Sequence, residues 1–218
     1  MKTNLIKVTG DWLDVVNACR STVSKPPLGR EPSKAFKTKI LISEHSPIRL
    51  ISFLWDWRAI MSWVATHWSR HKFEKFISTQ RTDRTGIDRN KLPQDEEVDF
   101  MGYANVQNLI DAFRKRLCYT ASPETRALGE DFRAVLRMIE PEISDVLVPN
   151  CVYRCGCPEM DMCENKTWLQ FKTWCESAHS LKPELLGIKR RYDLYNEWFY
   201  LQHGLLRKVD DRDGSQEE

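Results

Sequence analysis

The chain has 218 residues, of which 41% are hydrophobic and 29% are charged, a balance that fits a compact folded core and excludes wholesale disorder. Its 33 Lys and Arg residues nearly offset its 31 Asp and Glu residues, so the formal net charge of +2 gives no general reason to expect a nucleic-acid or membrane partner. The apolar runs are too short to cross a bilayer, and the N-terminal MKTNLIKVTGDW has no signal-type apolar core. We therefore expect a cytoplasmic protein.

The first third of the chain predicts helices on either side of a strand. Asp11 is a good helix-capping residue, and apolar residues follow it at helical spacing. The spacing then changes, because Ile51, Phe53, Trp55 and Trp57 alternate as they would on a half-buried strand. The expected elements are a helix over 12–23, a loop over 25–34, a helix over 33–44, a strand over 47–57 and a helix over 58–71.

The rest of the chain predicts a long loop followed by helices. Residues 82–100 show no apolar periodicity. An amphipathic helix is expected over 103–121, and Ser122-Pro123 is a typical N-cap and first-turn pair for another helix. We expect two further helices over 166–180 and 184–207, and a disordered tail over 210–218.

Residues 58–91 are locally basic, with eight Lys and Arg residues against three acidic ones. The arginine and hydroxyl groups of residues 69–84 suit a phosphate or another anion. A solvated charged surface is the plain alternative, since Lys and Arg are exposed by default. Nucleic-acid binding is a further alternative, although no recognised motif supports it.

Five short motifs follow one another in a specific order. They are Arg70-His71-Lys72, Thr79-Gln80-Arg81, Arg89-Asn90-Lys91-Leu92-Pro93, Asn105 with Arg116 eleven positions later, and Cys151 with Cys157-Pro158-Glu159. Together they resemble the flavin-dependent thymidylate synthases, whose hallmark is Arg-His-Arg and a following stretch that ends in Ser-x-Arg. The resemblance covers residues 15–163.

The resemblance implies an enzyme of nucleotide biosynthesis that methylates a pyrimidine deoxynucleotide at C5, converting dUMP to dTMP. Methylenetetrahydrofolate would supply the carbon, reduced FAD the hydride and NADPH the reducing equivalents. It also implies an α/β (α+β) fold with helices on a small, mostly antiparallel sheet, and active sites shared between the subunits of a homotetramer. The matching domain would span 1–163, with a helical extension over 164–209.

The same resemblance assigns roles to individual side chains. Arg116 would be the catalytic residue, because it stands where the family polarises the pyrimidine ring. Arginine suits this task, since it stays protonated and presents paired donors in one plane. The nucleotide would be bound by His67, Thr79, Gln80, Arg81, Arg89 and Arg116, and the flavin by Ser46, Arg70, His71, Lys72, Asn105 and Asp111. Neither a membrane nor a nucleic acid is expected as a partner.

The chain departs from the family pattern at several positions. Lys72 replaces the third hallmark arginine, and Gln107 stands where the family has an arginine. Only seven residues separate Arg81 from Arg89, where the family has a long, partly helical segment. Two alternatives therefore stay open. One is an enzyme on the same scaffold that alkylates a different pyrimidine nucleotide, and the other is a non-catalytic relative that binds a nucleotide or nucleic acid.

Four of the seven cysteines lie close together in the sequence, at Cys151, Cys155, Cys157 and Cys163. Thiolates in such a cluster are typical ligands of a structural zinc ion. The spacing is tighter than that of common zinc ribbons, so reduced thiols in a loop are the alternative. The odd number of cysteines argues against a disulfide framework.

Overall fold

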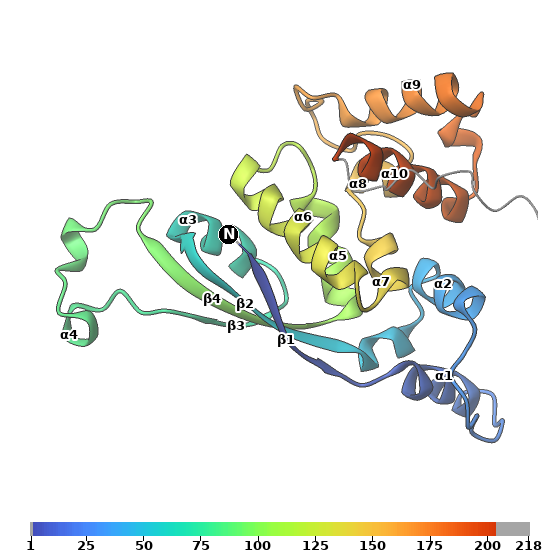
Figure 1. Ribbon diagram of the computed structural model, residues 1–218, viewed down its shortest axis with the longest axis horizontal. Helices are drawn as coiled ribbons and strands as arrows, with labels where there is room; N and C mark the ends of the chain where they lie inside the picture. The colour runs from blue at the N-terminus through green and yellow to red at the C-terminus, as the bar shows by residue number, and fades with distance from the viewer. Residues whose placement is uncertain (1, 204–218) are drawn as a thin grey trace, which may run out of the picture.

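The computed structural model describes residues 2–203 and shows helices packed on a four-stranded antiparallel sheet (Figure 1). The strands β1 (Thr3–Thr9), β2 (Ser52–Met61), β3 (Glu74–Ile77) and β4 (Glu97–Asn105) lie in the order β1-β2-β4-β3. The helices are α1 (Trp12–Ser21), α2 (Lys34–Ile42), η1 (Ser46–Leu50), α3 (Ser62–Ser69), α4 (Thr82–Thr85), η2 (Arg89–Lys91), α5 (Val106–Arg116), α6 (Pro123–Arg137), α7 (Pro141–Val146), α8 (Asn150–Tyr153), α9 (Thr167–His179), η3 (Pro183–Leu185) and α10 (Ile188–Gln202). The expected α+β fold is confirmed.

The central strand β2 contains the alternating residues that predicted it. Phe53, Trp55 and Trp57 are fully buried, and the strand pairs with β1 on one side and β4 on the other. The strand begins later than expected, because Pro47 lies in the first turn of the short 3-10 helix η1. It also continues beyond residue 57, and a bulge at Ala59, where φ is +49°, interrupts its pairing with β4.

An aromatic cluster joins the sheet to the helices that cover it. The ring of Trp55 lies 5.1 Å from that of Phe132 in α6, and the ring of Trp57 lies 5.0 Å from that of Trp68 in α3. Phe113 of α5 lies 5.3 Å from Phe132. Full burial of one such side chain contributes about 1.5–3 kcal/mol to folding. Helices α3, α5 and α6 therefore share one core on the same side of the sheet (Figure 1).

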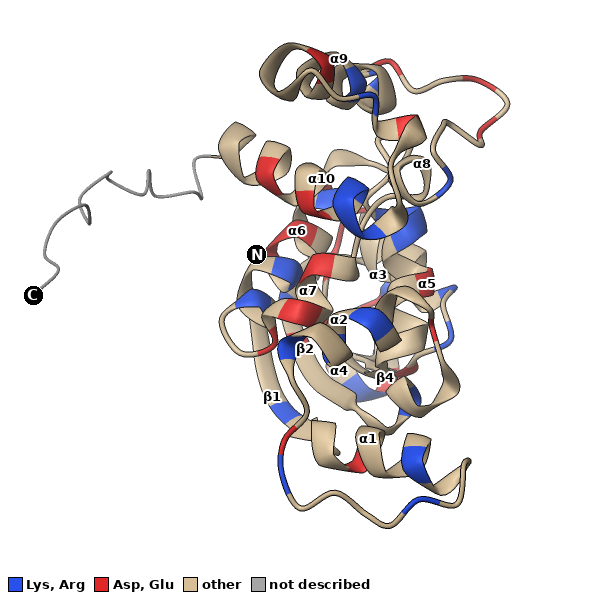
Figure 2. Ribbon diagram, turned by 90° about the vertical axis from the view of Figure 1, so that its right-hand side faces the viewer, with Lys and Arg blue, Asp and Glu red and all other residues tan. Residues whose placement is uncertain are grey.

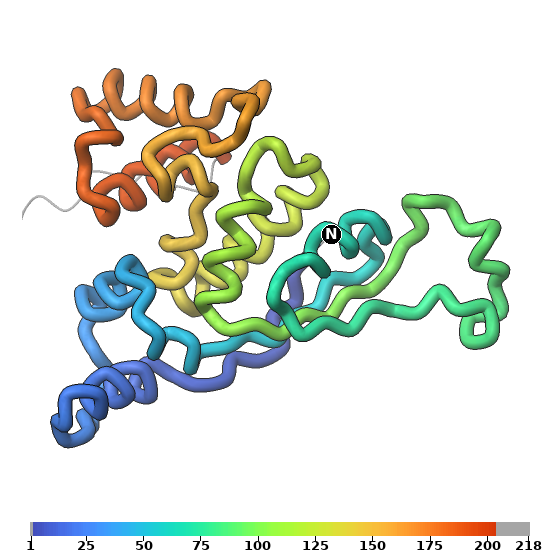
Figure 3. Tube along the Cα trace, turned by 180° about the vertical axis from the view of Figure 1, so that it is seen from behind, coloured from blue at the N-terminus to red at the C-terminus, as the bar shows by residue number. Residues whose placement is uncertain are grey.

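The segment between β3 and β4 forms an arm that projects from the body of the molecule (Figures 1 and 3). The four residues of β3 are exposed, including the side chain of Phe76 at 66%. Beyond β3, the chain runs through α4 and η2 before it returns as β4. The arm thus carries both of its short helices away from α5 and α6.

Two buried arginines tie the C-terminal helices to the rest of the chain. Arg133 of α6 is fully buried and donates to the carbonyl of Ser144 and to the side-chain oxygen of Asn196 in α10. Arg191 of α10 donates to the carbonyl of Val152 at 2.7 Å. These bonds offset much of the cost of burying the two guanidinium groups, although Nη1 of Arg133 is buried without a hydrogen-bond partner. The proposed division of the chain at residue 163 stays a prediction.

Most predicted helices are confirmed, but several strands were not expected. Helix α1 begins after Asp11, which caps it as predicted, and α6 begins after Ser122. The prediction of a loop over 82–100 is wrong in part, because α4, η2 and the start of β4 lie there. The prediction of a helix from residue 58 is wrong up to Met61, which still belongs to β2. The expected tail over 210–218 lies outside the described residues.

Within residues 2–203, no helix combines the length and the apolar character that crossing a membrane requires. The charged residues are well mixed, and Figure 2 shows Lys and Arg interspersed with Asp and Glu over the helices. This distribution agrees with the near-neutral net charge and indicates that any functional charge must be sought locally.

Candidate functional site

The end of α5 and the turn that follows α3 meet at a pair of side chains. Arg116, the last residue of α5, donates from Nε to Nε2 of His71 at 2.6 Å. Arg116 is half-buried because it flanks the buried stripe of α5, which includes Leu109 and Phe113. Lys115 is exposed, as the helical spacing predicts. The amphipathic pattern of α5 thus positions Arg116 toward α3.

Positive charge accumulates around this pair. The pKa of Arg116 is lowered by burial and by the nearby Arg70. Burial, together with Arg116 and Lys75, lowers the pKa of His71 to about 4, so this imidazole is neutral and can accept the bond from Arg116. Neither Arg70 nor Arg116 forms an ion pair with another residue in the range 2–203. Two guanidinium groups therefore lie close together without a carboxylate, which favours an anionic ligand.

A second histidine is held at the same place by α6. The ring Nδ1 of His67 lies 2.9 Å from Oγ1 of the buried Thr125, which in turn accepts a hydrogen bond from Ser122. Burial, Arg116 and Arg70 lower the pKa of His67. His67, Arg70, His71 and Arg116, called the α3–α5 cluster below, are the predicted site residues that one chain brings together.

The pKa of His71 predicts a loss of stability in acid. In the unfolded chain a histidine titrates near pH 6.5, whereas folded His71 titrates near pH 4. Between these pH values only the unfolded chain binds the proton, so the free energy of unfolding should fall as the pH falls through this window. Above it, the contribution is fully present.

Urea unfolding of the wild type and of His71→Gln, each at neutral and at mildly acidic pH, measures this effect. The fall in the unfolding midpoint should be smaller in His71→Gln, because the variant lacks the titrating group. The matched control His45→Gln, at an exposed histidine, should fall as the wild type does. An equal fall in all three proteins would show that His71 is not the group responsible.

The other residues expected to bind flavin surround α5 but have additional partners. Asn105 caps α5, and its side-chain oxygen accepts from the amide of Asn108 at 2.9 Å. The side chain of Asn108 donates to the carbonyl of Lys72 at 2.8 Å, which fixes the end of the hallmark motif against α5. Asp111 accepts from Gln107 at 3.3 Å. Helix η1, which begins at Ser46, also packs on α5.

The residues expected to bind the nucleotide phosphate lie elsewhere, on the arm. Thr79, Arg81 and Arg89 are exposed, and Arg81 is paired with Asp83 at 2.8 Å. Gln80 is half-buried. Figures 1 and 3 show the arm well separated from α5, so a single chain does not bring these residues to Arg116.

Two features of the α3–α5 cluster carried no clear signal in the sequence. Thr125 lies one residue after Glu124, and only the packing of α6 on α3 shows that it contacts His67. Arg114 belongs to the same basic run as Arg116, but it pairs with Glu44 and lies 3.6 Å over the ring of Tyr153. Of the three consecutive basic residues, Arg116 is thus the one that both faces the cluster and lacks an acidic partner in residues 2–203.

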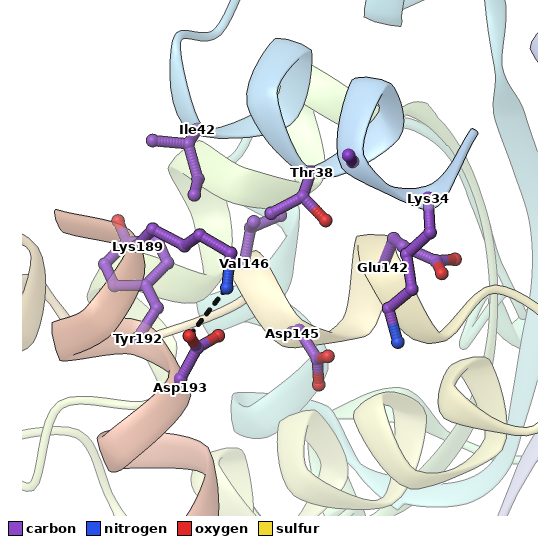
Figure 4. A pocket seen from close by; sticks show the side chains of 10 residues that line it. Lys34, Thr38, Ile42, Glu142, Asp145, Val146, Lys189, Tyr192 and Asp193 are labelled. Carbon is purple, nitrogen blue, oxygen red and sulfur yellow. Dashed lines mark hydrogen bonds and ion pairs between the residues drawn. The ribbon is translucent and has the colours of Figure 1, made fainter. Parts of the chain in front are cut away.

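A hollow between α2, α7 and α10 contains none of the predicted site residues (Figure 4). Its volume is about 490 Å³. Its wall has charges of both signs, and Lys189 is paired with Asp193 at 2.7 Å. Because three acidic residues, Glu142, Asp145 and Asp193, line this hollow, it offers less to an anion than the α3–α5 cluster does.

The cysteines are arranged differently from the expected set. Cys118, Cys151, Cys157 and Cys163 line one small cavity, whereas Cys155 is not among its lining residues. All seven cysteines are free thiols. No group of three or more His, Cys, Asp or Glu side chains within residues 2–203 is arranged so that it could hold a metal ion. A metal at the cysteines therefore stays a prediction.

No family model matches this chain, and no curated protein matches it in sequence. In three-dimensional structure, the chain is similar to the UMP/dUMP methylase PolB from Streptomyces cacaoi, bound with 5-bromo-dUMP. The similarity has a TM-score of 0.54 and covers 66% of this chain and 93% of that chain. The two chains share a fold. Their sequences are 14% identical, so the similarity concerns architecture, and the chemistry has to be argued from the residues.

Proposed function

We propose that this chain is a flavin-dependent enzyme that methylates C5 of a pyrimidine deoxynucleotide, converting dUMP to dTMP. Methylenetetrahydrofolate would donate the carbon and NADPH the reducing equivalents. The observation that carries the proposal is the α3–α5 cluster, in which Arg70 and Arg116 lie near neutral His71 without a compensating carboxylate. A UMP/dUMP methylase has the same fold, which shows that this architecture can hold a pyrimidine nucleotide and is compatible with the proposal.

The side chains present fit the charge of FAD. The pyrophosphate of FAD is anionic, and Arg70 and Lys72 are exposed cations at the end of α3. The N-terminus of α5, which Asn105 caps, adds backbone N–H donors. It lies close to Lys72, because the side chain of Asn108 donates to the Lys72 carbonyl. When bound, FAD would supply the hydride and redox chemistry, and the protein would supply orientation and electrostatics.

Arg116 would stabilise the charge that develops on the pyrimidine. C5 of the ring becomes nucleophilic when negative charge is present on the ring oxygens and N3, and it can then attack the one-carbon donor. A guanidinium held beside the ring offsets this charge, and its effect is strongest where burial excludes water. His71 acts as a positioning residue, because its bond to Nε of Arg116 leaves the terminal nitrogens free to point at the ring. His67 of α3, held by Thr125 of α6, would contact the nucleotide.

The phosphate-binding residues would come from another copy of the chain. Thr79, Gln80, Arg81 and Arg89 lie on the projecting arm, away from Arg116 (Figure 1). The exposed side chains of β3, which include Phe76, would be covered if the arm lay against a second subunit. This arrangement fits the proposed homotetramer with shared active sites.

The first experiment measures FAD affinity by fluorescence titration of the purified protein. We expect Arg70→Ala to weaken FAD binding about 10-fold to 100-fold, the scale of one charge-assisted hydrogen bond. Arg190→Ala, at an exposed arginine of α10, is the matched control and should bind FAD as the wild type does. Equal affinities of all three proteins would show that FAD does not bind at the α3–α5 cluster.

The choice of nucleotide has a specific alternative, since the structurally similar methylase acts on both UMP and dUMP. A different pyrimidine nucleotide is therefore the second candidate substrate. Flavin oxidation followed with dUMP, UMP and dCMP separates the candidates by rate. FAD binding without oxidation by any nucleotide would favour the non-catalytic relative instead.

A further inference from the structure

The hydrogen bond between Arg116 and His71 can have only one direction. An arginine side chain has N–H donors and no acceptor, so the 2.6 Å contact from Nε of Arg116 makes Nε2 of His71 the acceptor. The imidazole of His71 is neutral, because its pKa lies near 4, and a neutral imidazole carries one ring proton. That proton must therefore be on Nδ1 of His71. This nitrogen has no hydrogen-bond partner in residues 2–203 and is not buried, so it offers an N–H donor.

In His67 the opposite ring nitrogen is the acceptor. The buried hydroxyl of Thr125 accepts a hydrogen bond from the hydroxyl of Ser122 at 2.9 Å. Its own single proton is then available to Nδ1 of His67, which lies 2.9 Å away. Burial, Arg116 and Arg70 lower the pKa of His67, so its ring is also neutral at neutral pH. The ring proton of His67 is therefore on Nε2.

The reverse direction of this relay would leave a hydroxyl proton unused. His67 would then donate to Thr125, and Thr125 would donate to Ser122, which already accepts from the backbone amide of Thr125 at 3.4 Å. The half-buried hydroxyl of Ser122 would have no acceptor among residues 2–203. In the first direction, by contrast, each of the two hydroxyl protons has an acceptor. Because a donor without a partner is costly, the relay runs from Ser122 to His67.

The two imidazole rings are neighbours on α3 and its C-terminal turn. His67 and His71 are four residues apart, and Arg70 between them has helical dihedral angles, with φ −73° and ψ −9°. This spacing brings side chains to the same side of a helix. The ring of Trp63 lies 5.5 Å from that of His67, and the ring of Phe73 lies 5.8 Å from that of His71. These contacts restrict rotation of both imidazoles.

Every polar group that the α3–α5 cluster leaves free is therefore an N–H donor. The guanidinium groups of Arg70 and Arg116 have donors only, His67 offers Nε2–H, and His71 offers Nδ1–H. An oxygen of a ligand can accept from any of these groups. An amino group of a ligand finds no acceptor in the cluster, and leaving such a group unpaired is costly. Uracil has a carbonyl oxygen at C4, where cytosine has an amino group, so the cluster favours uracil.

We propose that Thr125 is a positioning residue that keeps the ring proton of His67 on Nε2. Together with the opposite tautomer of His71, it makes the site selective for pyrimidine nucleotides with a carbonyl group at C4 and against those with a 4-amino group. The choice of nucleotide rests on the proposed function. The positions of the two ring protons do not, because they follow from hydrogen bonds within the chain.

Solid-state ¹⁵N NMR of the full-length protein, labelled at histidine and free of nucleotide, locates these protons at neutral pH. His67→Gln and His71→Gln assign the signals by their loss. We expect Nδ1 to be protonated in His71 and Nε2 in His67. The exposed His45 is the internal reference, because an unrestrained neutral imidazole exchanges between its tautomers with Nε2–H in excess. Protonation of His71 on Nε2, or of His67 on Nδ1, would overturn the proposal.

The role of Thr125 is tested by removal and rescue of its hydroxyl. In Thr125→Val the signals of His67 should move to the averaged values of His45, and in Thr125→Ser they should stay as in the wild type. Thr173→Val, at an exposed threonine of α9, is the matched control and should leave His67 unchanged. Unchanged signals of His67 in Thr125→Val would refute the role of Thr125. If this variant does not fold, Thr125→Ser and the wild type still decide the proton positions.

Selectivity is measured by calorimetric titration of the protein with dUMP and with dCMP. The wild type should bind dUMP about 10-fold to 100-fold more tightly, the effect of one unpaired polar group. In Thr125→Val this ratio should fall, because an unprotonated Nε2 of His67 can accept from the amino group of dCMP. Structural damage alone would weaken both nucleotides and keep the ratio. Equal affinities in the wild type would overturn the selectivity, whereas binding of neither nucleotide would contradict the proposed function and leave the NMR result to decide the proton positions.

Discussion

Replacing Arg116 by lysine is expected to lower turnover about 100-fold or more, the effect of removing one preorganised donor from a developing negative charge. Lysine keeps the positive charge, but its ammonium cannot present two coplanar donors to the ring. It also lacks the Nε–H through which Arg116 binds His71 at 2.6 Å, so its head group is no longer held in place. The measurement is the rate of nucleotide-dependent flavin oxidation, with Arg190→Lys as the control for loss of an arginine elsewhere.

This substitution should change stability little. Arg116 is half-buried at the end of its helix, and lysine retains most of the aliphatic stem that packs there. Retained FAD and a melting temperature close to that of the wild type would show that the site is intact. Turnover at the wild-type rate in Arg116→Lys would mean that Arg116 is a structural residue and that the developing charge is stabilised by another group.

Replacing Gly102 by alanine is expected to lower the free energy of unfolding by about 2–3 kcal/mol, toward the upper end of the range for overpacking a core. A Cβ at position 102 would lie 2.4 Å from the indole of Trp55 on the neighbouring strand β2. The indole cannot move away, because Trp55 is fully buried and its ring is packed against Phe73 and Phe132. Urea unfolding at equilibrium measures the loss.

The matched control is Gly156→Ala. No atom outside its immediate neighbours lies within 4 Å of a Cβ at this position, so the added methyl group meets open space. This variant should unfold within about 0.5 kcal/mol of the wild type, as is usual for surface substitutions. If Gly102→Ala unfolded at the same urea concentration as Gly156→Ala, the close packing of Trp55 on β4 would be wrong.

Of two neighbouring strands, β2 was predicted from the sequence and β4 was not. The strand β2 is visible in the sequence, since its buried residues are large and alternate from Phe53 to Trp57. Its partner β4 was not predicted, because after Val98 and Phe100 its buried face continues with the small residues Gly102 and Ala104. Small residues carry little hydrophobic signal, and here they are required by a large side chain from another strand. Such complementarity between strands lies outside any local window of sequence.

The helices were easier to predict because their signals are local. The side chain of Asp11 accepts from the amide of Asp14 at 2.8 Å, and the side chain of Ser122 likewise caps α6. Capping residues and apolar periodicity act within one or two turns, so they can be read along the sequence. Helices α7 and α8 were missed because short helices have little intrinsic stability, and their positions are set by packing, of α7 chiefly on α6 and α2 and of α8 on α10.

The sequence by itself determined the longer helices, the central strand and the flanking position of Arg116 on α5, since each of these follows from local spacing and capping. Only the tertiary structure decided that Arg116 meets His71 from the turn after α3, that Arg114 is instead paired with Glu44, and that Cys118 lines one hollow with three distant cysteines. These contacts depend on how α5 packs against its neighbours, and packing is a long-range property that residue spacing does not encode. Because His71, Glu44 and Cys151 lie around the end of α5, the adjacent residues of this basic helix end have different partners and different roles.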